Sequence, residues 1–283
     1  MKTPYIFAKR FVAGESYDVA EKKVRAINQK GNRVTLDLLG ENIKDATKAS
    51  ATVDAYIELL EQIKASNLDS SISVKLTMMG LDISEEVCYD NLSRLLETAK
   101  AHNQFVRIDM EGSGNTQATI DIFKKALKDY QGHVGIVLQA YLHRTAKDVD
   151  DLASLGADIR LCKGAYKEPA TDALQSMDDI RAAFKEYAKI LVEKTPFPRM
   201  ATHDGSLVGW LQEYAQTEGL PKDRFEFQML YGLREKTMNK LSEDGWKTCI
   251  YVPYGTMWFP YFSRRLMERK ENVFFIATTL LKP

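Results

Sequence analysis

Short apolar, β-branched runs alternate with longer stretches of helical period along this chain. Eight runs read as strands, over residues 33–39, 73–78, 105–110, 134–140, 158–163, 199–202, 225–230 and 248–252. The segments after them have the composition and period of helices, over residues 41–66, 85–101, 116–128, 145–154, 173–194, 207–217, 234–243 and 257–269. Regular alternation of this kind predicts successive βα units and a parallel sheet.

Eight βα units within 283 residues favour an α/β fold of the closed (β/α)8, TIM-like type, whose usual size is about 250 residues. A doubly wound open sheet is the alternative. No linker rich in Pro, Gly or Ser and no internal repeat interrupts the rhythm. We therefore expect an N-terminal helical arm over residues 1–30 and one barrel domain over residues 31–283, which would carry the active site.

Charge and cysteine usage narrow the functional classes. Lys plus Arg equals Asp plus Glu at 39 each, so no net positive field would recruit nucleic acid. No apolar run approaches the roughly 20 residues of a membrane span, and we expect no signal peptide. Cys88, Cys162 and Cys249 are far apart and lack metal or redox spacing. These features predict a cytoplasmic protein with reduced thiols.

Polar residues gather where the expected strands end, which in a barrel of parallel strands is the active-site face. They are Lys75, Asp109, Glu111, Gln139, Tyr141, Arg160, Lys163, Tyr166, Thr202, His203, Asp204, Glu226, Gln228 and Tyr251. Charges inside strands need partners or ligands, because an unpaired buried charge costs several kcal/mol. The pattern predicts a ligand site. An ion-paired plug filling the barrel is the alternative, but it gives no reason for the extra tyrosines.

The last expected helix carries a second cationic feature. Helical spacing brings Tyr261, Arg264, Arg265 and Glu268 close to one face. Two guanidiniums can grip a carboxylate bidentately, which suits a small amino acid or carboxylic acid. The alternative is a solvated helix face on which Arg264 pairs with Glu268.

Several familiar motifs are absent. The segment Gly112-Ser113-Gly114 lacks the third glycine of a Rossmann fingerprint, and neither a P-loop nor a metal motif is present. Of the histidines, His203 alone lies where chemistry is expected. We therefore expect a metal-free site and, if a nucleotide binds, another mode of binding.

Taken together, the ordered segments resemble the proline dehydrogenases, flavin enzymes that oxidise L-proline to Δ1-pyrroline-5-carboxylate. The matching segments are 73–77, 107–111, 139–142, 160–166, 201–203, 225–232, 251–255 and 261–268. The resemblance implies a distorted (β/α)8 barrel with non-covalent FAD, and a role in the first step of proline catabolism to glutamate. It also implies that the electrons pass to a quinone.

The resemblance also implies roles for individual residues. Substrate binding would fall to Lys75, Tyr166, Tyr251, Arg264, Arg265 and Glu268, and catalysis to Asp109, Arg160 and Lys75. FAD binding would fall to Asp109, Met110, Gln139, Arg160, Lys163, Gly164, Ala165, Thr202, His203 and Gln228. Two positions depart from the family pattern: Lys167 replaces an aromatic residue, and Asp204 replaces an asparagine and would place a negative charge near the cofactor's ribose or diphosphate.

Oxidising a secondary amine to an imine removes a hydride, which no side chain accepts, so this chemistry needs an organic cofactor. The apolar segment 273–281 would either aid peripheral contact with the inner membrane face or pack on the barrel. Two rival functions stay open: a Schiff-base aldolase using Lys163 or Lys75, and a non-catalytic ligand sensor or scaffold.

Overall fold

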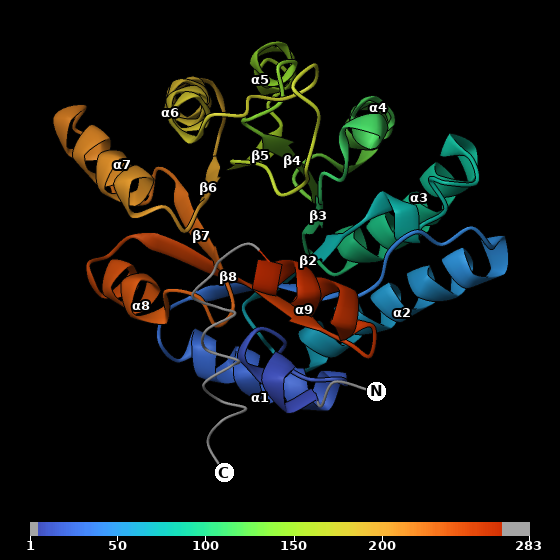
Figure 1. Ribbon diagram of the computed structural model, residues 1–283. Coiled ribbons are helices and arrows are strands. Elements are labelled where there is room, and N and C mark those ends of the chain that lie inside the picture. Colours follow the sequence, from blue (N-terminus) through green and yellow to red (C-terminus); the bar gives the residue numbers. More distant parts are fainter. Residues whose placement is uncertain (1–4, 268–283) are drawn as a thin grey trace.

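Eight parallel strands close into a barrel in the computed structural model, which describes residues 5–267, with side chains for residues 8–263 (Figure 1). In chain order they are β1 (Arg33–Leu38), β2 (Ser70–Val74), β3 (Val106–Ile108), β4 (Val134–Gln139), β5 (Asp158–Cys162), β6 (Arg199–Ala201), β7 (Glu226–Leu230) and β8 (Lys247–Tyr254). Each strand pairs with its sequence neighbours, and β8 pairs with β1. The predicted (β/α)8 barrel is confirmed, and the open sheet is wrong.

Helices form the outer ring around these strands, except the last one, which lies in front of β8 in the view and carries Tyr261 at the cavity (Figure 1). They are α2 (Ala46–Ala65), α3 (Glu85–Ala101), α4 (Thr116–Tyr130), α5 (Thr145–Ala153), α6 (Met177–Lys194), α7 (Gly205–Thr217), α8 (Glu235–Glu243) and α9 (Trp258–Met267). Two begin later than their helical composition predicted, because each starts at a side-chain cap: Asp45 accepts from the Lys48 N–H, and Ser176 from the Asp179 N–H. No helix in the described part of the chain is long and apolar enough to cross a membrane.

The second strand differs from its prediction over residues 73–78. It begins earlier, at Ser70, and the backbone after Lys75 turns into a short 3-10 helix, η2 (Leu76–Met78). All three residues of η2 are buried, and such a short apolar run does not distinguish a strand from a turn packed against the core. Lys75 therefore lies directly after the strand, where the barrel opens, and not within the strand.

The barrel is apolar outside and polar inside. Side chains alternate across a strand, and one set, which includes Val34, Leu36, Ile72 and Val74, belongs to the main hydrophobic core shared with the helices. The other set is polar or charged and also buried: Thr35, Asp37, Ser73, Arg107, Arg160, Glu226 and Gln228. This alternation explains why charged residues occur within the expected strands.

Near the strand starts, the interior is filled by an ion-paired cluster. Arg199 lies 2.7 Å from Asp158 and 3.0 Å from Glu226, and Arg107 also pairs with Asp158. Burial by itself would raise the pKa of Asp158, but the two arginines outweigh it and lower that pKa to about 2. Burial lowers the pKa of Arg107 to about 10. The plug alternative is therefore correct for this end of the barrel only.

The N-terminal segment packs on the barrel through η1 (Tyr5–Arg10) and α1 (Tyr17–Asn28). Phe11 and Val12 form a small buried cluster with Phe262 of α9, and the Ala13 N–H donates to the carbonyl of Pro253 in β8 at 2.8 Å. The buried face of α1 joins the main core. The domain boundary at residue 30 stays a prediction.

Candidate active site

A cavity of about 420 Å³ opens where the strands end. Thirteen of the predicted site residues line it: Lys75, Asp109, Met110, Gln139, Arg160, Lys163, Gly164, Ala165, Tyr166, Thr202, His203, Gln228 and Tyr251. They come from seven different strands or the loops that follow them. The fold thus brings together residues that are up to 176 positions apart, from Lys75 to Tyr251.

The carboxylate of Asp109 accepts hydrogen bonds from three side chains at the cavity floor. Its Oδ1 accepts hydrogen bonds from Arg160 Nη1 at 2.9 Å and from Ser73 Oγ at 2.6 Å, and its Oδ2 accepts from the Tyr251 hydroxyl at 2.7 Å. Burial and the nearby Asp109 carboxylate raise the pKa of Tyr251 well above its ordinary value. The Tyr251 hydroxyl therefore stays protonated and donates its hydrogen bond to Asp109. The same carboxylate fixes the Arg160 guanidinium, which lies 5.5 Å from the centre of the Tyr251 ring.

Lys75 is held by the carboxylate of Asp37, which was not among the predicted site residues. Its Nζ lies 2.9 Å from Asp37 Oδ1 and 3.9 Å from Asp109 Oδ2. Burial opposes the ammonium charge, but the attraction of Asp37 and Asp109 outweighs it and raises the pKa of Lys75 above its ordinary value. Lys75 is therefore a cation at neutral pH, at the cavity floor.

Backbone atoms form much of the wall near the ends of β4 and β5. Gln139 donates from Nε2 to the carbonyl of Glu111 at 2.9 Å and accepts from the Ala165 N–H at 3.3 Å, which ties together the ends of three strands. Gly164 has φ +126°, and a Cβ there would lie 2.4 Å from the Tyr141 ring. Only glycine fits this position without strain.

Asp204 joins three elements beside the cavity. Its Oδ2 lies 3.1 Å from Lys163 Nζ and accepts from Arg181 Nε of α6 at 2.9 Å. Its Oδ1 accepts from the Ser206 N–H at 3.1 Å, which caps α7. Burial opposes the charge, but these hydrogen bonds outweigh it and lower the pKa of Asp204 below its ordinary range. The charge expected at this position is thus neutralised by two cations.

Two further polar groups are fixed by β7. His203 Nε2 accepts from the Leu230 N–H at 2.8 Å, so a neutral ring carries its proton on Nδ1. Gln228 Nε2 donates to Glu226 Oε1 at 2.6 Å, which connects the cavity to the ion-paired cluster below it. Gln228 Oε1 and Arg160 Nε are buried and have no hydrogen-bond partner among the described residues.

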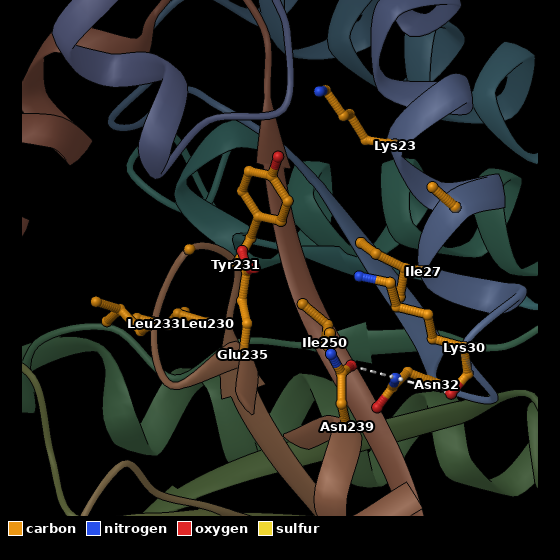
Figure 2. A pocket seen from close by; sticks show the side chains of 12 residues that line it. Lys23, Ile27, Lys30, Asn32, Leu230, Tyr231, Leu233, Glu235, Asn239 and Ile250 are labelled. Carbon is orange, nitrogen blue, oxygen red and sulfur yellow. Dashed lines mark hydrogen bonds between the residues drawn. The ribbon is translucent and has the colours of Figure 1, made fainter. Parts of the chain in front are cut away.

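A smaller pocket of about 140 Å³ lies between α1 and the turn from β7 to α8 (Figure 2). Asn32 donates to Asn239 at its base, and the side chain of Lys30 extends over it (Figure 2). It shares Leu230 and Leu233 with the large cavity but contains none of the predicted site residues. The large cavity is therefore the candidate active site.

The sequence model of the proline dehydrogenase family matches residues 20–278. The chain belongs to this family. It is 38% identical over 277 residues to proline dehydrogenase 2 of Bacillus subtilis (strain 168), covering 98% of this chain and 91% of that one. It is 35% identical over 279 residues to a proline dehydrogenase of Deinococcus radiodurans, covering 97% and 90%.

A solved structure extends the likeness to the fold. Proline utilization A of Bdellovibrio bacteriovorus, inactivated by N-propargylglycine, superposes with a TM-score of 0.86 at 25% identity, covering 93% of this chain and 32% of that one. The chain spans about a third of that solved protein. As a member of the proline dehydrogenase family, the chain is a flavin-dependent oxidoreductase that acts on proline, in the first step of proline catabolism.

The predicted arginine clamp falls on α9. This helix carries Tyr261, which lines the cavity, and its bounds include Arg264 and Arg265, although the described side chains end at residue 263. Glu268 lies outside the described residues. The roles of these three residues in a proline dehydrogenase stay predictions, as does the metal-free site, although residues 5–267 contain no cluster of side chains that could hold a metal.

Asp37 and Ser73, which hold Lys75 and Asp109, were not among the predicted site residues. Asp37 carried a usable signal, since it is a charged residue between two leucines near the end of an expected strand, and charge near a strand end is the criterion that identified Asp109 and Arg160. Ser73 carried none, because a serine in a strand is ordinary. Cys162 and Met177 also line the cavity without any pattern in the sequence that predicted it.

Proposed function

We propose that this proline dehydrogenase oxidises L-proline to Δ1-pyrroline-5-carboxylate by hydride transfer to FAD held in the large cavity, and that a quinone then takes the electrons. The observation that carries the proposal is the charged floor of the cavity. There, Lys75, Asp109 and Arg160 are fixed by hydrogen bonds and ion pairs and still line the open volume. These residues present oriented charges, in a partly desolvated site, to the carboxylate of the substrate and to the edge of the cofactor.

The residues present fit a flavin. Gly164 lets the ring of Tyr141 pack against the backbone of the cavity wall, and the buried Gln228 Oε1 and Arg160 Nε supply an acceptor and a donor without partners among the described residues. The residues that would hold FAD are Asp109, Met110, Gln139, Arg160, Lys163, Gly164, Ala165, Thr202, His203 and Gln228. When bound, FAD supplies the hydride acceptor that no side chain provides.

The protein's own contribution is to bind and orient proline. Lys75 would bind the carboxylate together with Arg264 and Arg265, while Tyr166 and Tyr251 would form the walls around the ring. Glu268 would orient the arginines. Cations close to the amine favour its neutral form, which is the form able to lose hydride. Asp109 keeps Arg160 and the Tyr251 hydroxyl in place, so the ring meets a preformed pocket.

The Schiff-base alternative is poorly supported. A nucleophilic lysine needs a lowered pKa, whereas Asp37 and Asp109 raise the pKa of Lys75. Lys163 is engaged with Asp204 at 3.1 Å. The membrane contact considered for residues 273–281 falls outside the described residues and stays a prediction, as does a peripheral location at the membrane.

The test is the visible spectrum of the purified protein during anaerobic titration with L-proline. We expect a flavin spectrum that bleaches with proline and returns when a soluble quinone is added. Cyclopentanecarboxylate is the matched control, since it keeps the ring and carboxylate but has no amine to oxidise, and it should cause no bleaching. A protein that stays colourless after incubation with FAD and reduces no dye with proline contradicts the proposal.

A further inference from the structure

We propose that Asp37 is a positioning residue for Lys75, fixing the lysine ammonium at the cavity floor so that its remaining N–H groups can bind the substrate carboxylate. This inference rests on the proposed function and adds a residue to it. Asp37 has no hydrogen bond or ion pair with Arg160 among the described contacts, but its carboxylate also interacts with the hydroxyl of Tyr251. It would act on the carboxylate of proline through Lys75.

The register of the barrel places the two side chains together. Asp37 near the end of β1 is the Cα partner of Ser73 in β2, and Lys75 follows two residues later, on the same side of the chain. The Asp37 side chain is completely buried and that of Lys75 is 9% exposed, with 2.9 Å between Oδ1 and Nζ. The pair is therefore shielded from bulk water; both side chains border the cavity, and the lysine is the more exposed of the two.

Among the described carboxylates, Asp37 makes the shortest ion pair with Lys75. Asp109 is the other carboxylate nearby, but it lies 3.9 Å from Nζ. Its oxygens already accept hydrogen bonds from Ser73, Arg160 and Tyr251. Glu111 is bonded to Thr77 instead. Glu111 and the hydroxyl of Tyr166, in the loop after β5, also interact electrostatically with Lys75.

Stability alone does not explain a pair in this place. A buried ion pair often stabilises a protein no more than apolar residues of similar volume would. A buried lysine without a counter-ion tends to lose its proton. A neutral amine at the cavity floor would lose most of its attraction for a carboxylate. The charge of Asp37 thus preserves the charge that substrate binding needs.

The substitution Asp37→Asn separates these roles, because it keeps the shape and the oxygen near Lys75 but removes the negative charge. The measurement is the dissociation constant of L-tetrahydrofuran-2-carboxylate, the analogue of proline with oxygen in place of the ring nitrogen. It is measured by calorimetry on the flavin-loaded enzyme from neutral pH to about pH 10, just below the ordinary pKa of lysine. We expect affinity to hold nearly constant in the wild type. In Asp37→Asn it should fall about ten- to a hundredfold as the pH rises, which matches the loss of one hydrogen bond to a charged group.

Glu111→Gln is the matched control. It neutralises another buried carboxylate at the same end of the barrel, one bonded to Thr77 at 3.1 and 2.7 Å, and should keep the wild-type pH dependence. Parallel pH profiles for Asp37→Asn and the wild type would overturn the proposal, and so would an equal loss of affinity at every pH. If the wild-type enzyme itself fails to bind the analogue, the proposed function fails instead, so the two failures are distinguishable.

A stability cycle tests the pair without any ligand. Lys75→Met leaves the Asp37 carboxylate buried without its cation, so it should lower the denaturation midpoint. Adding Asp37→Asn to that variant should restore part of the loss, because the stranded charge is removed. A double variant that unfolds no later than Lys75→Met would show that the two side chains are not coupled. That result would overturn the proposal even if Asp37→Asn alone failed to fold, because it compares only the other two variants.

Discussion

Replacing Gly164 by alanine should destabilise the barrel at the wall of the active site and weaken flavin retention. Two costs are visible in the structure. The φ of +126° is one that side chains rarely adopt, at a cost of about 1–3 kcal/mol. The new Cβ would also lie 2.4 Å from the ring of Tyr141, whose side chain is buried, and overpacking of this kind costs about 1–3 kcal/mol.

Together these costs predict a loss of about 2–6 kcal/mol in the free energy of unfolding, measurable by guanidinium titration. Two other glycines separate the contributions. Gly132 has φ +86° but open space around its Cβ position, and Gly114 has neither a positive φ nor a neighbour within 4 Å. Gly132→Ala should show the backbone cost alone, and Gly114→Ala almost none.

The same three variants should differ in flavin content after purification, with Gly164→Ala alone depleted. If Gly164→Ala unfolds at the same denaturant concentration as Gly114→Ala, neither cost exists at this position. A loss equal to that of Gly132→Ala would show that Tyr141 moves aside at little cost. In that case the wall of the cavity is softer than its packing indicates.

Three further predictions concern charged residues. Asp109→Ala should lower kcat/KM about tenfold to a hundredfold, the cost of losing hydrogen bonds to a charged group. The melting temperature should change less. Equal relative losses of activity and stability would favour a purely structural role. Arg265→Ala should raise KM for proline without releasing the flavin, and an unchanged KM would remove the clamp assignment. Asp158 has a folded-state pKa of about 2 against about 3.9 when unfolded. The unfolded chain therefore binds protons first on acidification, and stability on the order of 2 kcal/mol is present above about pH 4 and lost towards pH 2. Urea unfolding at stepped pH measures this loss, and Asp158→Asn should flatten it.

The sequence predicted the barrel because its signals were local and repeated. Each βα unit carries its own apolar run and its own helical period, so errors in one unit left the others intact. The misplaced second strand shows the limit of such signals. The buried residues Leu76, Thr77 and Met78 continue the apolar run of β2, although the backbone has already turned, and a turn of this kind has no periodic signature.

Site residues were predictable where a charged side chain occurred in an expected strand, because strands of a parallel barrel are mostly apolar. Asp109 and Arg160 are charges in strands that should be apolar, and both line the cavity. What could not be predicted was which charges face each other. Arg107 and Arg160 look alike in sequence, but Arg107 pairs with Asp158 in the ion-paired cluster below, and Arg160 pairs with Asp109 at the cavity floor. Composition does not indicate which partner each arginine has.

The ion-paired cluster beneath the cavity also constrains how this sequence can diverge. The side chains of Arg107, Asp158, Arg199 and Glu226 are joined by ion pairs. A mutation that removes one of these charges therefore leaves a neighbouring charge buried without its partner. Drift at these positions should therefore proceed by concerted exchange, with a cation and an anion lost or swapped together. Homologous sequences in which these four positions vary independently of one another would show that water reaches the barrel floor.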